Sequence, residues 1–416
     1  MHRPIRLLLT LAVGAGLLSV AAVPGNAAPT SAATASAVPA TVTAAAAVTT
    51  TATFNDPAGD SAAQSRVRDH ILGLIDQAPA GSSITAGLYT FTEDTVTDAL
   101  HAAKTRGVDV KVIVDHTSTT MSGGEYTRLA ERLGTDRTQG SWVFACPAGR
   151  GCIGTRKLPN DPDGAINHNK FFLFSSTGGA NDVVVQTSAN MTNVQRTDLF
   201  NNAVTIVDSG LYAIYRAYWA DLLAYGTSST GLSHYYKTPE SGPYKTYFFP
   251  RKEAAGTTFD NDASTDTIKL ILDNVSCSGG TQVRMAANLF TRDEVATKLV
   301  ALKNAGCSVI LAHDGAAESM SSGVESIISG KLTKRVECQE DRGTGVAKVG
   351  LHSKYLLVEG TYNGTSGRKL VFTGSHNYTY PALRANDETL LKIDDAALYD
   401  QYRANHDRLM SYCEGS

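Results

Sequence analysis

Two stretches of the chain show the same succession of hydrophobic and polar positions. Residues 81–115 and 280–314 align without a gap, and each begins with an apolar run typical of a strand. Each continues with apolar residues at helical spacing and then a second β-rich run, 108–114 or 307–311. The helical positions are Val96, Leu100 and Ala103 in the first stretch and Val295, Leu299 and Leu302 in the second.

Each stretch therefore predicts a strand–helix–strand unit. Gly107 and Gly306 follow the predicted helices at the place where a left-handed cap is easiest to form. Two strands joined by a helix pair in parallel through a right-handed crossover. The repeat predicts an α/β fold made of two similar halves.

Downstream of each unit, two further apolar strands carry a repeated set of polar residues. The first strand bears the pattern H-x-K and the second ends in S-x-N. Side chains two positions apart lie on one face of a strand, so the histidine and the lysine can reach one ligand. The candidate site residues are His168, Lys170, Ser188 and Asn190 in the first half, and His352, Lys354, Ser375 and Asn377 in the second.

This set of side chains suits a phosphodiester. Lysine ammonium groups balance the phosphoryl charge, while asparagine amides and serine hydroxyls donate hydrogen bonds to the phosphate oxygens. Two histidines allow covalent catalysis, in which one attacks phosphorus and the other serves as acid and then as base. No cluster of carboxylates or C-x2-C pair indicates a metal, so we expect neither a metal nor another cofactor.

The duplicated H-x-K…S-x-N pattern resembles the phospholipase D superfamily over residues 54–416. The resemblance implies a pseudo-twofold sandwich with one active site at the interface of the two halves. It also implies a metal-independent phosphohistidine mechanism. The beginning of the chain is similar to that of exported actinobacterial members.

Several positions depart from the family pattern. An acid is usual five residues after the lysine, where this chain has Ser175 and Glu359, and Thr187 replaces the glycine before Ser188. A further acid follows S-x-N in the family and orients a histidine; Glu388 fits this role, whereas the first half has Asn202 there, with Asp198 nearby.

The choice of nucleophile stays open at this point. A carboxylate behind a histidine fixes its tautomer, so a pairing of Glu388 with His352 would favour His352. The resemblance instead favours His168. We expect His116 and His376 to be neighbours of the site rather than catalytic residues.

The N-terminal 27 residues predict a signal peptide. Arg3 and Arg6 precede an apolar run from Leu7 to Val23, and small residues follow it. This run is short for a membrane span, so we expect an exported protein with no transmembrane anchor. Removal of the two arginines would change the formal charge from −3 to −5.

Composition divides the rest of the chain. Residues 28–52 contain no charge and predict a disordered spacer. We expect the first half at 53–225, a linker at 226–259 and the second half at 260–416. The aromatic residues of the linker, Tyr235, Tyr236 and 247–249, either form a rim with Arg251 and Lys252 or pack against the halves. Tyr212, Tyr215, Tyr218 and Trp219 have the spacing of a buried helix face.

Six cysteines in an exported chain predict up to three disulfides. We expect Cys146 to pair with Cys152 across a short loop. The other four, Cys277, Cys307, Cys338 and Cys413, allow three connectivities.

Charge narrows the choice of function. With 37 Lys and Arg against 40 Asp and Glu, the chain has no global positive field for nucleic acid. We expect a secreted, monomeric phospholipase D-type phosphodiesterase that hydrolyses or transfers the head group of a phospholipid at a membrane or micelle surface. The alternatives are a nuclease, which the charge disfavours, and a catalytically silent phospholipid-binding protein. Transfer of the cardiolipin-synthase kind is disfavoured by the predicted export.

Overall fold

The computed structural model describes residues 47–159, 161, 164–343 and 348–415. The predicted signal peptide lies outside the described residues, as does the predicted spacer up to residue 46. The end of the predicted spacer differs from the expectation, because Thr51 and Ala52 open strand β1 (Thr51–Phe54). This strand pairs antiparallel with β8 (Asn202–Val207), which gives its backbone polar groups partners.

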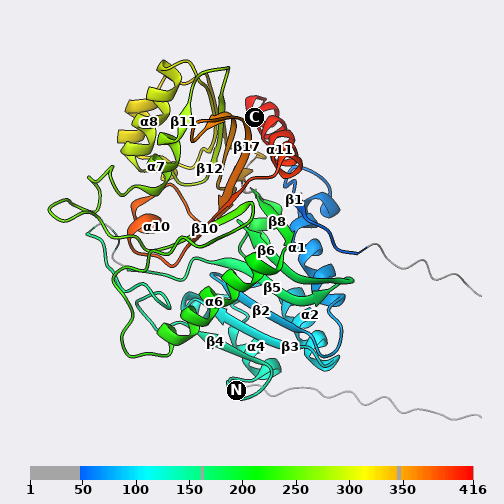
Figure 1. The fold of residues 1–416 in the computed structure, drawn as a ribbon. Coiled ribbons are helices and arrows are strands. Elements are labelled where there is room, and N and C mark those ends of the chain that lie inside the picture. The colour runs from blue at the N-terminus through cyan, green and yellow to red at the C-terminus, as the bar shows by residue number, and fades with distance from the viewer. Residues whose placement is uncertain (1–46, 160, 162–163, 344–347, 416) are drawn as a thin grey trace, which may run out of the picture. The chain divides into compact units, whose positions relative to one another are not determined.

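The first half forms a seven-stranded sheet in the order β1-β8-β6-β5-β2-β3-β4 (Figure 1). The two strands of the repeat, β2 and β3, pair in parallel as the sequence predicts, and β4 adds to β3 in the same direction. The remaining neighbours are antiparallel. The bounds are β2 (Ser83–Leu88), β3 (Asp109–Val114), β4 (Trp142–Ala145), β5 (Lys170–Thr177) and β6 (Ala180–Thr187).

The second half repeats this arrangement. Its sheet has the order β14-β13-β12-β16-β17-β18-β10-β9, with β11 beside β16, and β12, β13 and β14 are again parallel. The bounds are β9 (Glu240–Ser241), β10 (Tyr244–Phe248), β11 (Val275–Ser276), β12 (Gln282–Ala287), β13 (Ser308–Asp314), β14 (Lys334–Cys338), β16 (Tyr355–Tyr362), β17 (Thr365–Gly374) and β18 (Thr389–Ile393).

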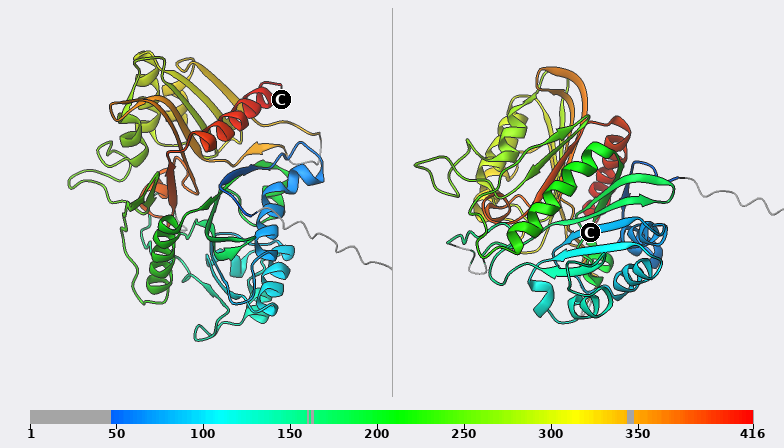
Figure 2. Two further views of the ribbon diagram at one scale, coloured as in Figure 1. Left: turned by 45° about the vertical axis from the view of Figure 1, so that its right-hand side comes forward. Right: turned by 60° about the horizontal axis from the view of Figure 1, so that its bottom comes forward.

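Helices cover both sheets and also lie between them (Figures 1 and 2). One apolar core joins the first sheet to the helices of its outer face, and a second core does the same for the second sheet. A third core lies between the sheets and contains the apolar faces of α6 and α11. The helices are α1 (Ser61–Asp76), α2 (Asp94–Thr105), α3 (Thr117–Thr120), α4 (Tyr126–Leu133), α5 (Asn193–Thr197), α6 (Ser209–Gly226), α7 (Thr267–Asp273), α8 (Asp293–Asn304), α9 (Ser322–Ile328), α10 (Tyr380–Arg384) and α11 (Ala396–Glu414).

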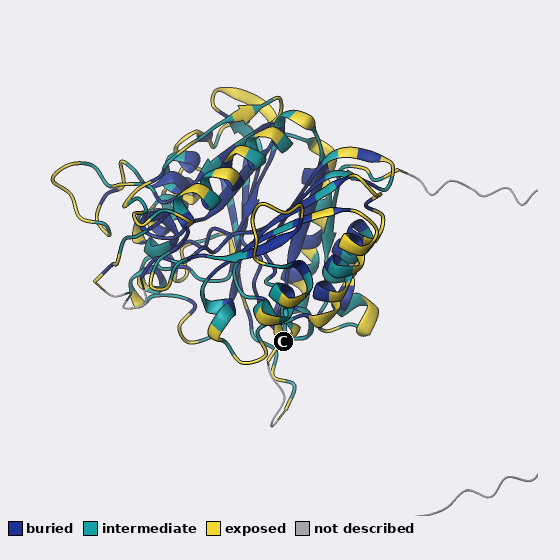
Figure 3. Cartoon of the chain, turned by 90° about the horizontal axis from the view of Figure 1, so that it is seen from below, coloured by how far each residue is buried: buried dark blue, intermediate teal, exposed yellow. Residues whose placement is uncertain are grey.

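Burial follows this layering. The strands are mostly buried, and the outer helices expose one side, as Figure 3 shows. Tyr215, Tyr218 and Trp219 of α6 are buried in this third core, which confirms the predicted helix face at these three positions. Tyr212, the fourth, is partly buried against the same core. No helix within the described part of the chain combines the length and apolar character needed to cross a bilayer.

The predicted linker contributes a strand to the second sheet. β10 pairs antiparallel with β18, and its alternating residues Tyr244, Thr246 and Phe248 are buried. It occupies the place beside β18 that β1 occupies beside β8, so this segment belongs structurally to the second half. Tyr235 and Phe249 are also buried, which supports the packing alternative over an exposed aromatic rim.

The six cysteines form three disulfides. The predicted Cys146–Cys152 bond is present, and the open choice among the other four is decided as Cys277–Cys307 and Cys338–Cys413. The last of these ties the end of β14 to the C-terminal helix α11.

Candidate active site

The two H-x-K motifs meet at one cavity. His168 lies two residues ahead of β5 and His352 three residues ahead of β16, so each histidine lies just before the strand rather than on it. Both line a cavity of about 810 Å³. Asn190 and Asn377 from the two S-x-N motifs line the same cavity. The structure therefore brings together residues that lie far apart in the sequence.

Short backbone pairings between the two halves hold the histidines in place. β15 (Gly350–Leu351), just ahead of His352, pairs in parallel with β7 (Leu199–Phe200) of the first half. The backbone N–H of His352 donates to the Phe200 carbonyl at 2.9 Å. In the other half, the N–H of His168 donates to the Asp387 carbonyl at 3.0 Å. Each histidine thus lies beside the segment that follows S-x-N in the opposite half.

The exchange pairs His168 with a carboxylate of the second half. Nδ1 of His168 lies 2.8 Å from Oε1 of Glu388, which is fully buried. The other carboxylate oxygen accepts a 2.5 Å hydrogen bond from the hydroxyl of Ser375. The expectation that Glu388 supports His352 is therefore wrong, because the crossed backbone pairing carries each partner to the histidine of the other half.

His352 has a neutral partner instead. Its Nδ1 lies 3.0 Å from Oδ1 of Asn201, which also accepts a 2.9 Å hydrogen bond from the hydroxyl of Ser188. Asn202, the residue suggested by the sequence, donates instead to Thr373 and Tyr402.

Asp198, the acid noted near this segment, forms an ion pair with Arg342 at 2.6 Å. The counterpart of Glu388 is therefore Asn201. An exact residue count from the S-x-N serine would have found it, because each partner follows its serine at the same spacing.

Both lysines are buried beside their histidines. Nζ of Lys170 donates to the carbonyl of His168 at 2.7 Å, and Nζ of Lys354 donates to the carbonyl of His352 at 2.6 Å. Burial lowers the pKa of Lys170 to about 7, although Glu388 and Asp115 oppose the shift. Burial and the charge of Lys170 lower the pKa of Lys354 as well. An anion bound between the lysines would favour their charged forms.

The histidines are also poised to be neutral. Burial lowers the pKa of His168 to about 4, against the opposing charge of Glu388. Burial, followed by Lys354 and Lys170, lowers the pKa of His352 well below its usual value. A neutral imidazole whose Nδ1–H is bonded presents the lone pair of Nε2, which is the form needed for attack or for proton acceptance.

The S-x-N residues divide into two roles. The hydroxyls of Ser188 and Ser375 are buried and donate to Asn201 and Glu388, so their protons are engaged with the histidine partners rather than with a phosphate. The Oδ1 atoms of Asn190 and Asn377 are buried with no hydrogen-bond partner in the described structure. Both residues line the cavity, and the amide Nδ2 is the atom that can donate to a phosphate oxygen, so phosphate binding stays their predicted role.

Two aspartates that sequence reasoning did not single out position the histidine loops. Oδ2 of Asp115 accepts the backbone N–H of Asn167, and Oδ1 of Asp314 accepts that of Leu351, both at 2.7 Å. Each contact fixes the residue directly before a histidine. The available signal was that these aspartates align as the last residues of the sequence repeat.

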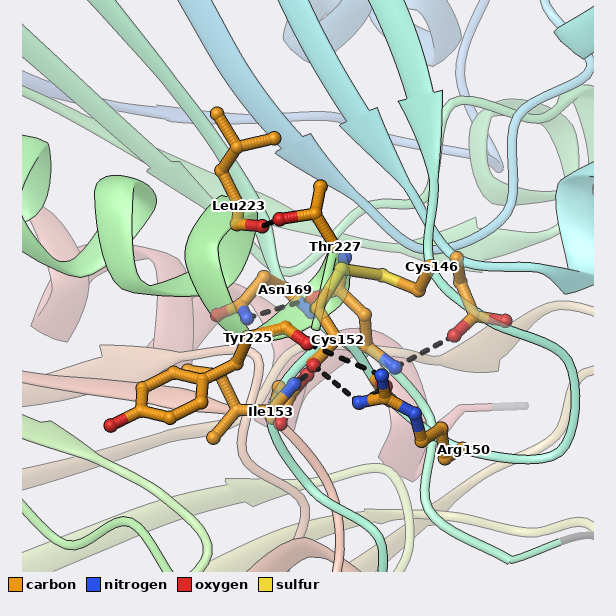
Figure 4. The surroundings of a disulfide bond; sticks show 12 residues. Cys146, Arg150, Cys152, Ile153, Asn169, Leu223, Tyr225 and Thr227 are labelled. Atoms are coloured by element: carbon orange, nitrogen blue, oxygen red, sulfur yellow. Dashed lines mark hydrogen bonds between the residues drawn. A yellow bond between two sulfur atoms is a disulfide. The ribbon is translucent and has the colours of Figure 1, made fainter. Parts of the chain in front are cut away.

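The loop closed by Cys146–Cys152 forms part of the cavity wall, to which it contributes Gly149 and Arg150. The guanidinium of Arg150 donates to four backbone carbonyls, among them those of Cys152 and Tyr225 (Figure 4). The loop thus has a fixed shape beside the site.

Asp387 holds the continuation of this loop. Its carboxylate accepts the backbone N–H groups of Ile153 at 2.9 Å and Gly154 at 2.7 Å. The same residue accepts the N–H of His168 through its carbonyl. Asp387 therefore joins the disulfide loop, the first histidine and the segment that carries Glu388.

His116 and His376, the two other histidines considered from the sequence, lie next to the site. His116 lines the cavity, together with Tyr89, whose ring lies 5.0 Å from that of His168. His376 is buried against Phe249, with 4.3 Å between ring centroids, and does not line the cavity.

The departures from the family pattern lie away from the cavity. Ser175 lies near the far end of β5, where its hydroxyl accepts the N–H of Ser83. Glu359 accepts a hydrogen bond from Tyr399 at the corresponding end of β16. Thr187 is accommodated because its hydroxyl donates to the carbonyl of Asn202. None of the three removes a group from the site.

Within the described ranges, no group of three His, Cys, Asp or Glu side chains is arranged to hold a metal ion. The candidate site residues that line the cavity are the two histidines and the two asparagines of the motifs.

Comparison with known proteins agrees with this architecture. The family model described as "Cardiolipin synthase, PLD-like domain" matches residues 71–223 and 275–410, one segment in each half. No curated protein matches the chain.

Two solved structures share the fold. Phosphatidylserine synthase from Haemophilus influenzae Rd KW20 is 14% identical, with a TM-score of 0.54 and coverage of 86% of both chains. Polyphosphate kinase from Porphyromonas gingivalis is also 14% identical, with a TM-score of 0.51. That match covers 86% of this chain, which spans about half (50%) of the kinase.

A shorter match is Nuc, a phospholipase D family member from Salmonella typhimurium, at 22% identity and a TM-score of 0.31. It covers 44% of this chain and 99% of Nuc. The two segments matched by the family model, 71–223 and 275–410, include most of both halves, and each contains one H-x-K and one S-x-N motif. The chain belongs to this PLD-like domain family, and with it to the phospholipase D superfamily.

Proposed function

We propose that the protein is a secreted phosphodiesterase that hydrolyses the head-group bond of a phospholipid through a phosphohistidine at His168. Membership of the superfamily gives the general chemistry, which is action on phosphodiesters. The observation that carries the proposal is the convergence of both histidines on one cavity, each with the ammonium group of a buried lysine bonded to its carbonyl. A silent binding protein would have no need for two histidines whose rings are both held through Nδ1.

The contacts of the histidines assign their roles. Attack by Nε2 leaves a positive charge on the imidazole that becomes phosphorylated, and a carboxylate on Nδ1 stabilises that charge. Glu388 lies on His168, which makes His168 the better nucleophile. Glu388 does not contact His352, so this carboxylate gives no reason to choose His352 as the nucleophile.

The reaction then proceeds in two balanced steps. Nε2 of His168 forms a bond to phosphorus while the bond to the leaving oxygen breaks, and His352 in its protonated form gives its Nε2 proton to that oxygen. His352 next takes a proton from water, whose oxygen attacks phosphorus and breaks the P–N bond. Lys170 and Lys354 balance the phosphoryl charge, and Asn190 and Asn377 donate to its oxygens.

Export is part of the proposal. The first 27 residues have the order of a signal peptide, and all six cysteines are paired, which fits an oxidising compartment.

A nuclease is the second candidate. Most of the residues that line the cavity are polar, Thr117, Asn288, Thr291 and Asn386 among them, and such a wall would also suit the backbone of a nucleic acid. The formal charge of −3 opposes this alternative.

One substrate panel tests the proposal. Phospholipids with choline, ethanolamine, serine and glycerol head groups, sphingomyelin, and single- and double-stranded DNA are offered with and without chelator. Release of a head group from a phospholipid is expected, and loss of this release in His352→Ala ties it to the site. Cleavage of DNA with no phospholipid turnover would establish the nuclease instead.

A further inference from the structure

We propose that Asn201 is a positioning residue that holds His352 with its proton on Nδ1, and that this neutral amide sets the basic limit of the enzyme's working pH range. The inference rests on the proposed function, in which His352 supplies the proton to the leaving group. It concerns the residue that orients a histidine from a position after S-x-N. The resemblance to the superfamily identified no such residue in the first half.

The two halves show that Asn201 and Glu388 hold equivalent places. In each half the hydroxyl of the S-x-N serine donates to this group, and the group faces Nδ1 of the histidine from the other half. The geometry is nearly the same, at 3.0 Å for Asn201 and 2.8 Å for Glu388. The difference between the two places is therefore one of charge.

The surroundings of Asn201 are built for an amide. Its Nδ2 donates to the carbonyls of Gln195 at 2.8 Å and Leu199 at 3.1 Å, and its backbone N–H donates to Oδ1 of Asn55 at 2.6 Å. An amide turned the other way would place its oxygen against two carbonyl oxygens. The acceptor Oδ1 must therefore face His352, and Nδ1 of His352 must be the donor.

This contact stabilises the charged form of His352 much less than a carboxylate would. A carboxylate would stabilise an imidazolium by its full charge, whereas an amide offers only a dipole. The charged groups that bear on His352 are Lys354 from its own strand and Lys170 from the first half, both of which disfavour a further positive charge. His168, facing it across the site, acts in the same direction when protonated.

The neighbouring carboxylates are already engaged. Glu388 binds His168, and Asp314 accepts the backbone N–H of Leu351. Asp115 binds the backbone of Asn167, and its neighbour His116 is a further titratable group on the cavity wall. None of these contacts gives the imidazolium of His352 an anionic partner.

A kinetic signature follows from this arrangement. Because the first step needs protonated His352, kcat/KM should fall as the pH rises above the pKa of His352 in the free enzyme. The fall should begin at a lower pH than it would with a carboxylate at position 201. It should be strong for an alkyl leaving group and weak for p-nitrophenolate, which departs without a proton.

The pH profiles of the wild type and Asn201→Asp test this signature. We expect the basic limb of kcat/KM for an alkyl phosphodiester to move up by at least one pH unit in the variant, a tenfold gain at a fixed pH on that limb. With bis(p-nitrophenyl) phosphate the two profiles should differ much less. Equal basic limbs for the alkyl substrate in a folded variant would overturn the proposal.

A spectroscopic measurement on the unaltered protein covers the case in which Asn201→Asp fails to fold. Nitrogen-15 shifts of labelled histidines, with His352 assigned by its loss in His352→Gln, report protonation and tautomer directly. We expect neutral His352 with the proton on Nδ1 at pH 6. A charged ring or an Nε2–H tautomer at that pH would overturn the proposal. This readout needs no substrate, so it remains decisive even if the enzyme proves inactive on phospholipids.

Discussion

Replacing Glu388 by glutamine should remove charge from the partner of His168 while keeping its shape. The glutamine amide can still accept from Nδ1 and bond to Ser375, so the ring should keep its orientation. What is lost is the attraction between the carboxylate and the positive charge that forms on the phosphorylated ring. Two unit charges about 4 Å apart attract by about 4 kcal/mol at an effective dielectric constant of about 20.

That energy sets the expected loss of rate. Since about 1.4 kcal/mol corresponds to tenfold, Glu388→Gln should lower kcat by roughly 10²–10³-fold. Steady-state kinetics with bis(p-nitrophenyl) phosphate measures the effect on formation of the phosphohistidine, because this substrate does not need the general acid. Acid-quenched mass spectrometry should show less adduct on His168 at early times.

Glu359→Gln is the matched control. Glu359 occupies the acidic position of the second H-x-K motif but lies at the other end of β16, bonded to Tyr399. Its replacement should leave kcat within about twofold. A drop of less than fivefold in Glu388→Gln, with an unchanged thermal midpoint, would refute the role of Glu388 and the assignment of His168 as nucleophile.

Three further outcomes are expected. Activity should survive a strong chelator, because Lys170 and Lys354 carry the positive charge; loss that only a divalent ion restores, with the fold intact, would contradict this. Burial lowers the pKa of Lys170 to about 7, and only the protonated lysine attracts an anion, so inhibition by inorganic phosphate should weaken up to tenfold per pH unit above pH 7; constant inhibition would contradict it. Gly154→Ala should cost about 1–3 kcal/mol of unfolding free energy in denaturant titrations, because its Cβ would lie 2.2 Å from the carbonyl oxygen of Ala385; unchanged stability would show that the loop can yield.

The sequence predicts the repeated units well, because they rest on local spacing. The parallel pairing of β2 with β3 and of β12 with β13 follows from the strand–helix–strand pattern. The burial of α6 follows from its aromatic spacing. His168 and His352 line one cavity, as two matching motifs in a duplicated chain suggest.

The partners of the histidines could not be predicted in the same way. Glu388 lies closer to His352 than to His168 in the sequence, yet it contacts His168 because Asn167 and Asp387 pair across the halves. Such an exchange leaves no mark in hydrophobic periodicity. Strand β10 was not predicted either, because its five residues lie within a segment rich in Gly, Ser, Thr and Pro.

The crossed contacts have a consequence for how the two halves can diverge. If two identical chains formed this site, a single codon would specify both histidine partners, and any change at one would appear at the other. Here Glu388 and Asn201 are encoded separately, although they occupy equivalent places. Duplication within one polypeptide thus frees each imidazole to evolve its own basicity, and a symmetric ancestor can become a catalyst whose two sides are no longer interchangeable.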